Sequence, residues 1–179
     1  MEPIQDRELK TSRLYIEPLV EKHAELLFEL LQDHKIYTFI PEKPPASISA
    51  LRKRYKLLEK RKSPSLPQIW LNWALRLREN GKYIGTLQAT IDDNKTAFIA
   101  YVLSPKFWRQ GLAFEACVKL LEFLFAEYQI IKIFADVDKN NKSSINLLTK
   151  LGFAITMSRS SKSDYFYELT NEAFFQKFR

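Results

Sequence analysis

Small and basic residues gather in the segment Arg109-Gln-Gly-Leu-Ala113, which lies between two contrasting patterns. Residues 96–103 form a β-branched and aromatic run that predicts a buried strand, and residues 112–128 repeat apolar side chains at helical spacing. The first backbone N–H groups of a helix have no partners within it, and the small residues Gly111 and Ala113 would let an anion approach them. With the charge of Arg109, the pattern predicts a phosphate-binding loop; a tight turn without a ligand is the alternative for such a loop taken alone.

Three motifs, in order along the chain, resemble the GNAT superfamily of N-acetyltransferases. The loop with Trp108 three positions before Gly111 is similar to the acyl-coenzyme A pyrophosphate loop of the branch that includes the ribosomal-protein N-terminal acetyltransferases. Residues 141–144 (Asn-Lys-Ser-Ser) and 150–153 (Lys-Leu-Gly-Phe) resemble the Asn-x-x-Ser and Leu-Gly-Phe signatures of that branch. Residues 9–16 resemble its opening strand, so the resemblance extends over about residues 9–178.

The order of the expected elements predicts an α+β domain with a central mixed sheet. Strands are expected over 13–19, 70–78, 83–91, 96–103 and 131–137, a closing hairpin over 153–159 and 165–170, and helices over 21–32, from Ser47 or Ser49 to about 62, over 112–128, from Asn141 to Gly152, and from Asn171. The resemblance implies in addition a mostly antiparallel sheet flanked by helices. It also implies that the fourth and fifth strands, 96–103 and 131–137, splay apart and that the cofactor lies in the gap.

The resemblance implies acetyl-CoA as the cofactor and assigns residues to it. The backbone of Tyr101, Val102 and Leu103 would pair with the pantetheine arm and polarise the thioester carbonyl. The loop formed by Arg109, Gln110, Gly111, Leu112 and Ala113 would hold the pyrophosphate. Asn141 would hydrogen-bond the pantetheine, and its alternative role as a helix N-cap is compatible with that. Ser144 would face the sulfur and assist catalysis together with Tyr101; the alternative for Ser144 is a solvated helical serine.

Two departures from the family pattern concern proton transfer. Phe98 stands where many relatives carry Glu, and Leu148 stands where many carry a Tyr acid. Asp136, Asp138, Tyr101 and Tyr167 are replacements by residue type, but the spacing singles out none of them. An α-amine has a pKa of about 8 and a lysine amine a pKa of about 10.4, so a larger fraction of the α-amine is neutral at pH 7. Because a neutral amine needs less help from a base, the lack of an evident base favours an α-amine acceptor.

Composition bounds the class of protein. With 179 residues, 46% of them hydrophobic, the chain is expected to form a single domain, 1–179. The sequence contains no signal peptide and no apolar run long enough to span a membrane. We therefore expect a cytoplasmic protein with no membrane partner. Cys117, the single cysteine, is expected in the core, where it can form no disulfide within the chain. The two histidines, His23 and His34, stand apart from other metal-ligand residues, so no metal site is expected. Glu115 is expected to form a helix-surface ion pair with Lys119.

The net charge of +7 is concentrated in one segment, residues 52–62, which holds seven basic residues and one acidic residue, or +6. A solvated helix face is one interpretation, and docking to an anionic particle such as a ribosome is another. Direct binding of single-stranded nucleic acid is disfavoured, because Tyr55 is the only aromatic residue in the segment.

These observations together predict an acetyl-CoA-dependent transferase that acetylates a primary amine, in particular a protein or peptide N-terminal α-amine. The expected partners are a small-molecule acyl donor and an amine or peptide acceptor, and the chain is expected to be a monomer or homodimer. A coenzyme A-binding module without catalytic activity is the alternative, favoured by Phe98 and Leu148. A nucleic-acid-binding protein is a third hypothesis.

Overall fold

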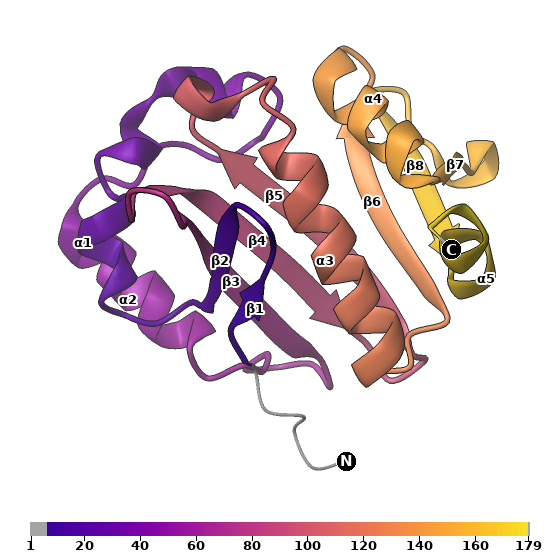
Figure 1. Cartoon of the computed structure of the whole chain (residues 1–179), viewed down its shortest axis with the longest axis horizontal. Helices are drawn as coiled ribbons and strands as arrows, with labels where there is room; N and C mark the ends of the chain where they lie inside the picture. The colour runs from indigo at the N-terminus through magenta and orange to yellow at the C-terminus, as the bar shows by residue number, and fades with distance from the viewer. Residues whose placement is uncertain (1–6, 179) are drawn as a thin grey trace.

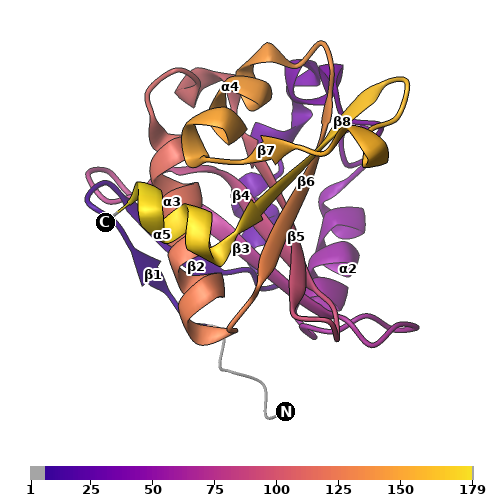
Figure 2. The same ribbon diagram turned by 90° about the vertical axis from the view of Figure 1, so that its right-hand side faces the viewer.

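The computed structural model describes residues 7–178, so the two ends of the expected domain, 1–6 and 179, lie outside it. An eight-stranded sheet runs in the order β1-β2-β3-β4-β5-β6-β8-β7 and separates two groups of helices (Figures 1 and 2). The strands are β1 Leu9–Lys10, β2 Leu14–Pro18, β3 Ile69–Leu77, β4 Tyr83–Ile91, β5 Thr96–Leu103, β6 Lys132–Asp138, β7 Ala154–Ile155 and β8 Asp164–Thr170. The helices are α1 His23–Leu27, α2 Ile48–Leu58, α3 Leu112–Glu127, α4 Lys142–Leu151 and α5 Asn171–Lys177, with 3-10 segments η1 Leu30–Gln32, η2 His34–Thr38, η3 Pro105–Phe107 and η4 Met157–Arg159. The expected α+β architecture is confirmed.

The pairing of β5 with β6 is the parallel step in an otherwise antiparallel sheet. It extends over three residue pairs, from Thr96 with Lys132 to Phe98 with Phe134. Beyond Phe98 the two strands diverge, β5 staying on β4 as far as Leu103 and β6 staying on β8 (Figure 1). The splay expected between the fourth and fifth strands is therefore confirmed.

Two hydrophobic cores lie on opposite faces of the sheet. The larger core packs α3 against residues such as Leu75, Leu87 and Ile99, and it includes the buried Cys117. The smaller core packs α1 and α2 against Ala74. Figure 2 shows α3 and α5 on one side of the strands and α2 on the other.

The smaller core changes the expected environment of β3. Its alternating pattern predicts a half-buried strand, but Asn72 and Ala74, on the face opposite Leu71 and Trp73, are also buried. The reason is that α2 covers this face, with Leu51 among the residues that pack there. One polar residue, Asn72, is consequently enclosed in the middle of an apolar strand.

The helix expected over residues 21–32 is shorter than predicted. α1 ends at Leu27, and the chain continues through η1 and η2, where Asp33 caps the second segment by accepting a hydrogen bond from the Lys35 N–H. Leu31 and Ile36 are both buried in the smaller core.

Three further expectations about element ends need correction. Ser47 caps α2 as expected by accepting from the Ala50 N–H at 3.1 Å, but the helix ends at Leu58 rather than near residue 62. Ile131 precedes β6 and is 54% exposed, so it does not line the strand face. The closing hairpin forms, but β7 is only two residues long before η4 begins. Among residues 7–178, no helix is both long and apolar enough to cross a bilayer.

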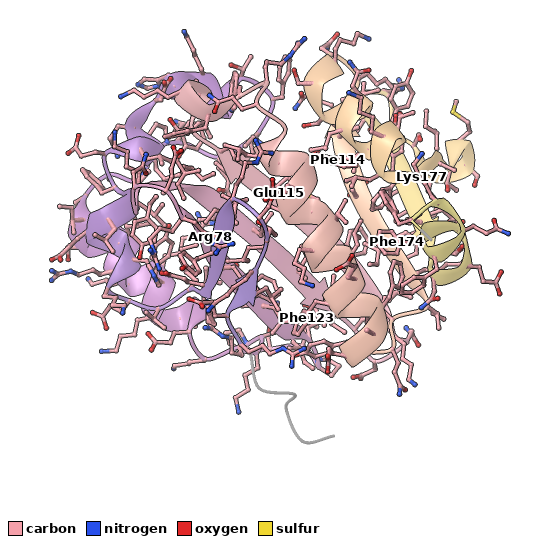
Figure 3. The ribbon with its side chains drawn as sticks, viewed as in Figure 1. Arg78, Phe114, Glu115, Phe123, Phe174 and Lys177 are labelled. Atoms are coloured by element: carbon pink, nitrogen blue, oxygen red, sulfur yellow. The ribbon has the colours of Figure 1, made fainter. Side chains whose placement is uncertain are left out.

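Glu115 does not pair with Lys119, which instead contacts Glu122 at 3.1 Å. The Glu115 carboxylate accepts hydrogen bonds from the turn between β1 and β2, including 2.6 Å from Nε of Arg13. Arg78, the residue directly after β3, holds the same turn by donating to the backbone carbonyls of residues 11 and 12 (Glu115 and Arg78 are labelled in Figure 3). The prediction of a surface ion pair is therefore wrong, because the first turn of α3 lies against another element rather than against solvent.

Replacing Gly85 with alanine tests the close approach of β4 and β5. A Cβ at Gly85 would lie 2.0 Å from the backbone oxygen of Val102, so one strand must move. We expect Gly85→Ala to lower the free energy of unfolding by about 2 kcal/mol or more. The matched control is Gly81→Ala, where a Cβ meets nothing within 4 Å and the cost comes only from φ of +72°, or about 1 kcal/mol. Equal losses for the two variants in chemical denaturation would contradict the expected clash.

Replacing Glu115 with glutamine tests the anchoring of the β1–β2 turn. Burial raises the pKa of Glu115, but hydrogen bonds from Thr11, Arg13 and Ser12 outweigh it and hold the pKa below its usual value. We therefore expect Glu115→Gln to cost about 1–3 kcal/mol at pH 7. A lowered folded-state pKa stabilises the fold above the unfolded value, about 4.3, so the difference from wild type should shrink as pH falls through and below that value. Glu122→Gln, which removes an exposed pair on the same helix, should cost less than about 0.5 kcal/mol.

Candidate active site

A cavity of about 580 Å³ lies where β5 and β6 diverge, between the end of β5, the start of α3 and the start of α4. It is lined by nine of the residues that the sequence predicts for cofactor binding or catalysis: Tyr101, Val102, Leu103, Arg109, Gly111, Leu112, Ala113, Asn141 and Ser144. Phe107, Trp108 and Phe114 add apolar surface to the same wall. Residues that are distant in the sequence thus share one cavity.

The loop before α3 is held in an unusual backbone conformation. Arg109 has φ of 62°, which is uncommon for a residue with a side chain, and Gly111 has φ of 76° as the N-cap of α3. No described side chain caps this helix end. An uncapped helix N-terminus beside an arginine can accept a phosphate group, so these residues fit a nucleotide pyrophosphate.

Two side chains fix this loop in place. Trp108 donates from Nε1 to the Leu103 carbonyl at 2.8 Å, and Arg13 donates from Nη1 to the Gln110 carbonyl at 2.9 Å. The Leu103 carbonyl is therefore already bonded within the protein. Neither anchor is evident from the sequence, although the motif with Trp108 indicates that this position is special.

Gln110 is placed differently from its predicted neighbours. Its side chain is exposed and donates to the Lys106 carbonyl at 3.0 Å, and Gln110 is not among the residues that line the cavity. The reason is the positive φ of Arg109 just before it, which turns the chain at this point. A role for Gln110 in cofactor binding is supported only by the position of its neighbours, Arg109 and Gly111, in the cavity wall.

The start of α4 supplies the opposite wall. The Asn141 side chain accepts a hydrogen bond from the Ser144 N–H at 3.1 Å, so Asn141 is an N-cap, as the alternative interpretation predicts. Burial raises the pKa of the Tyr101 hydroxyl, Cys117 adds to that effect, and a side-chain hydrogen bond with Ser144 opposes it. Tyr101 is therefore a neutral hydroxyl at pH 7 that lies within reach of Ser144.

A second cavity, also of about 580 Å³, lies on the other face of the sheet, under α2. Its floor includes Asn72, Thr86, Gln88 and Ala100, and Asp136 stands in its wall on β6. Both cavities are lined by Tyr101, Val102, Asn141 and Ser144. The two cavities therefore meet at the end of β5.

The four candidates for proton transfer lie in different places, and Tyr101 is the one at the junction of the two cavities. Asp136 and Asp138 line the second cavity, whereas Tyr167 is buried in the larger core, away from both cavities. Asp136 remains accessible, but its place in the wall withdraws it partly from water, which raises its pKa. The Asp164 carboxylate raises this pKa further, and the Arg159 guanidinium acts in the opposite direction.

The two departures from the family pattern have packing roles. Phe98 contacts Phe134 and Phe166, with ring centroids 5.3 and 5.9 Å away, and forms part of an aromatic cluster on the sheet. Leu148 is 1% exposed and belongs to the larger core. Neither position can exchange a proton, so the chain must use other groups.

Several lining residues are not singled out by the sequence. Lys35, Ile36, Phe39 and Ile40 line the first cavity, although the segment containing them reads only as the end of a helix followed by prolines. Asn72 is the clearest missed signal in the second cavity, because a polar residue in the middle of an apolar strand needs a partner or a function.

The basic segment forms ion pairs with acidic residues of neighbouring segments. Arg52 pairs with Glu25, Arg54 pairs with Glu42 at 3.3 Å, and Lys56 pairs with Glu21 at 3.8 Å. These exposed pairs support the interpretation of a solvated helix face for part of the segment.

Comparisons with known proteins agree with this geometry. Residues 13–154 match the family model described as the acetyltransferase (GNAT) domain. The uncharacterized N-acetyltransferase YoaA of Bacillus subtilis (strain 168) is 25% identical over 151 residues, 81% of this chain and 81% of that protein.

Solved structures share the fold. RimL, a ribosomal L7/L12 alpha-N-protein acetyltransferase in complex with coenzyme A, has a TM-score of 0.77 at 19% identity, covering 91% of this chain and 97% of that one. The ribosomal-protein-S5-alanine acetyltransferase of Vibrio fischeri also has a TM-score of 0.77, at 14% identity, covering 93% of this chain and 98% of that one. Because the family model matches most of the chain, the protein belongs to the GNAT family of N-acetyltransferases, whose acyl donor is acetyl-CoA.

Proposed function

We propose that the protein transfers the acetyl group of acetyl-CoA to a primary amine, and that this amine is the α-amino group of a protein or peptide. The observation that carries the proposal is the meeting of two cavities at Tyr101, Val102, Asn141 and Ser144. One cavity fits the donor and the other fits the acceptor, so the reacting groups would face each other across the end of β5.

The donor cavity has the features that coenzyme A requires. The uncapped start of α3 and Arg109 would bind the pyrophosphate, and the edge of β5 beyond Phe98, which β6 leaves free, would pair with an extended arm. Acetyl-CoA supplies an activated acetyl thioester. Val102, Asn141 and Ser144 would position that end of the cofactor at the junction of the cavities.

Proton transfer is assigned to groups at this junction. The amine must be neutral to react, and Asp136, whose pKa is raised, stands in the wall of the acceptor cavity as a carboxylate that can accept its proton. Tyr101 and Ser144 are hydroxyl groups that share a hydrogen bond and can supply a proton to the departing thiolate. Tyr101, held neutral by burial, keeps that proton at pH 7.

Two observations support an α-amine over a lysine amine. The α-amine has the lower pKa and needs a weaker base, which suits an exposed carboxylate such as Asp136. RimL, a structural neighbour, is by name an α-N-protein acetyltransferase.

A single buried cysteine, Cys117, suits a reducing compartment, so we place the protein in the cytoplasm.

A coenzyme A-binding module without catalysis is the alternative, and the apolar residues at Phe98 and Leu148 favour it. Thiol release in the presence of a panel of amines separates the two functions. Release that depends on an amine supports the transferase, and binding of coenzyme A without any release supports the module.

Introducing glutamate at Gly111 tests the donor cavity. The new carboxylate would place negative charge at the start of α3, and its Cβ would lie 3.4 Å from Nη2 of Arg13. We expect Gly111→Glu to weaken coenzyme A affinity, measured by calorimetry, by at least about tenfold. The matched control is Gly81→Glu, at a glycine with a similar φ of +72° but no atom within 4 Å of its Cβ. Unchanged affinity in a folded Gly111→Glu variant would disprove the assignment of this loop.

Removing the hydroxyl of Ser144 tests the catalytic assignment. If Ser144 and Tyr101 assist the departing thiolate, Ser144→Ala and Tyr101→Phe should each lower kcat by about tenfold or more and change coenzyme A affinity by less than about threefold. Steady-state thiol release and calorimetry measure the two effects separately. If turnover and affinity fall together, Ser144 binds the cofactor only; if neither changes, its role is structural.

A further inference from the structure

The inner end of the second cavity contains a polar side chain without a partner. Asn72 is 4% exposed, and its Nδ2 donates to no atom of the described residues 7–178. The backbone of Asn72 is used in the fold, since its carbonyl accepts from the Leu19 N–H at 2.8 Å, but its side chain is not. An unpartnered buried amide lowers stability, and a ligand in the cavity that Asn72 lines could supply the missing partner.

A second polar group lies in the same wall. Tyr55, on α2, is 4% exposed and lines this cavity, and burial raises the pKa of its hydroxyl. Unlike Nδ2 of Asn72, this hydroxyl is not an enclosed atom without a partner in residues 7–178, and a ligand in the cavity could bond to it. Asn72 and Tyr55 are both uncharged at pH 7, and both can donate and accept hydrogen bonds.

The surroundings of this inner end are apolar. Leu19, Leu51 and Leu58 line the same part of the chain's smaller core and contribute to the cavity wall. Three of the acidic residues that line the cavity, Asp136, Asp138 and Asp164, come from β6 and β8 instead. The fourth, Glu42, pairs with Arg54 of α2 at 3.3 Å, and Lys43 lies beside it in the lining. The cavity therefore has an acidic end at the strand gap and a neutral polar end under α2.

The register of the sheet gives the separation of the two ends. Asn72 pairs with Gln88 on β4, and Gln88 pairs with Ala100 on β5, next to Tyr101. Two strand spacings separate Asn72 from Ala100, or about 10 Å. A ligand that reaches both ends must therefore be elongated.

We propose that the acceptor is an elongated primary amine whose far end carries an uncharged hydrogen-bonding group, an amide or a hydroxyl, that Asn72 and Tyr55 bind. The inference rests on the proposed function, because it takes the second cavity as the acceptor site. The reactive amine lies at the acidic end, and the neutral group fills the hydrogen bonds that the fold leaves unmade.

The proposal predicts the order of acceptors. A cationic far end must lose its water beside apolar residues and compete with Arg54 for Glu42, and a hydrocarbon end leaves the Asn72 amide unpaired. An uncharged amide avoids both costs. For a chain of suitable length, 6-aminohexanamide should therefore bind better than hexylamine and better than 1,6-diaminohexane.

The test measures the affinity of these three amines by calorimetry, with coenzyme A absent and at saturation. We expect the wild-type protein to bind 6-aminohexanamide at least about tenfold more tightly than either other amine. In Asn72→Leu and in Tyr55→Phe this preference should fall below about threefold. Asn72→Leu removes a buried donor without a partner, so its midpoint of thermal unfolding should not fall below that of wild type.

The chain provides a matched control in Trp73→Phe. Trp73 also has a buried Nε1 without a described partner, but it belongs to the larger core on the opposite face and does not line the cavity. The amide preference should survive in this variant. Tyr55→Phe decides the question by itself if Asn72→Leu does not fold.

The proposal is overturned if wild type shows no amide preference, if 1,6-diaminohexane binds as tightly as the amide, or if the preference survives in the folded variants. Unchanged preference combined with a lower unfolding midpoint in Asn72→Leu would make Asn72 a structural residue. Failure of the proposed function is a different result: selective amide binding without thiol release would refute catalysis and leave the second cavity as a binding site for such amines.

Discussion

The parallel pairing of β5 with β6 ends after three residue pairs, and the functional geometry depends on that limit. Antiparallel partners, β4 and β8, hold the two strands on their outer edges, so the strands diverge without either being lost from the sheet. The divergence leaves one edge of β5 without a strand partner and brings the starts of α3 and α4 to the same opening. It also lets cavities on opposite faces of the sheet meet at Tyr101 and Ser144.

The opening is bounded by rigid parts. Gly85 allows β4 to approach the backbone of β5 at Val102, Trp108 ties the following loop to Leu103, and Arg13 ties it to Gln110. Arg13 is in turn held by Glu115 on α3. The positive φ of Arg109, uncommon for a non-glycine residue, is thus surrounded by contacts that determine it, which is the usual condition for such a conformation at a functional site.

Basic and acidic side chains are concentrated in different parts of the molecule. The surface is basic, with most of the excess in residues 52–62, yet three of those residues pair with Glu25, Glu42 and Glu21. The second cavity, which we propose as the acceptor cavity, by contrast carries carboxylates on β6 and β8. Phe98 joins an aromatic cluster, so the carboxylate at the gap comes from β6, in Asp136, rather than from β5. A cationic amine is attracted to that wall of the cavity.

The sequence by itself determined most of the elements and the position of the loop before α3. Gly111, Asn141 and Gly152 act locally, through a positive φ or a cap within a few residues, so their positions could be predicted. The order of the elements predicted the α+β class, and the resemblance predicted the splay. Glu115, by contrast, could be read only against its own helix, and its true partners lie about a hundred residues away in the sequence, since it bonds Arg13. Asn72 and Tyr55 share a cavity only because α2 packs over β3, and Asp136 reaches the same cavity only because β6 leaves β5. Local rules of capping and periodicity contain no information on such long-range packing, and the acceptor cavity was therefore decided by the tertiary structure alone.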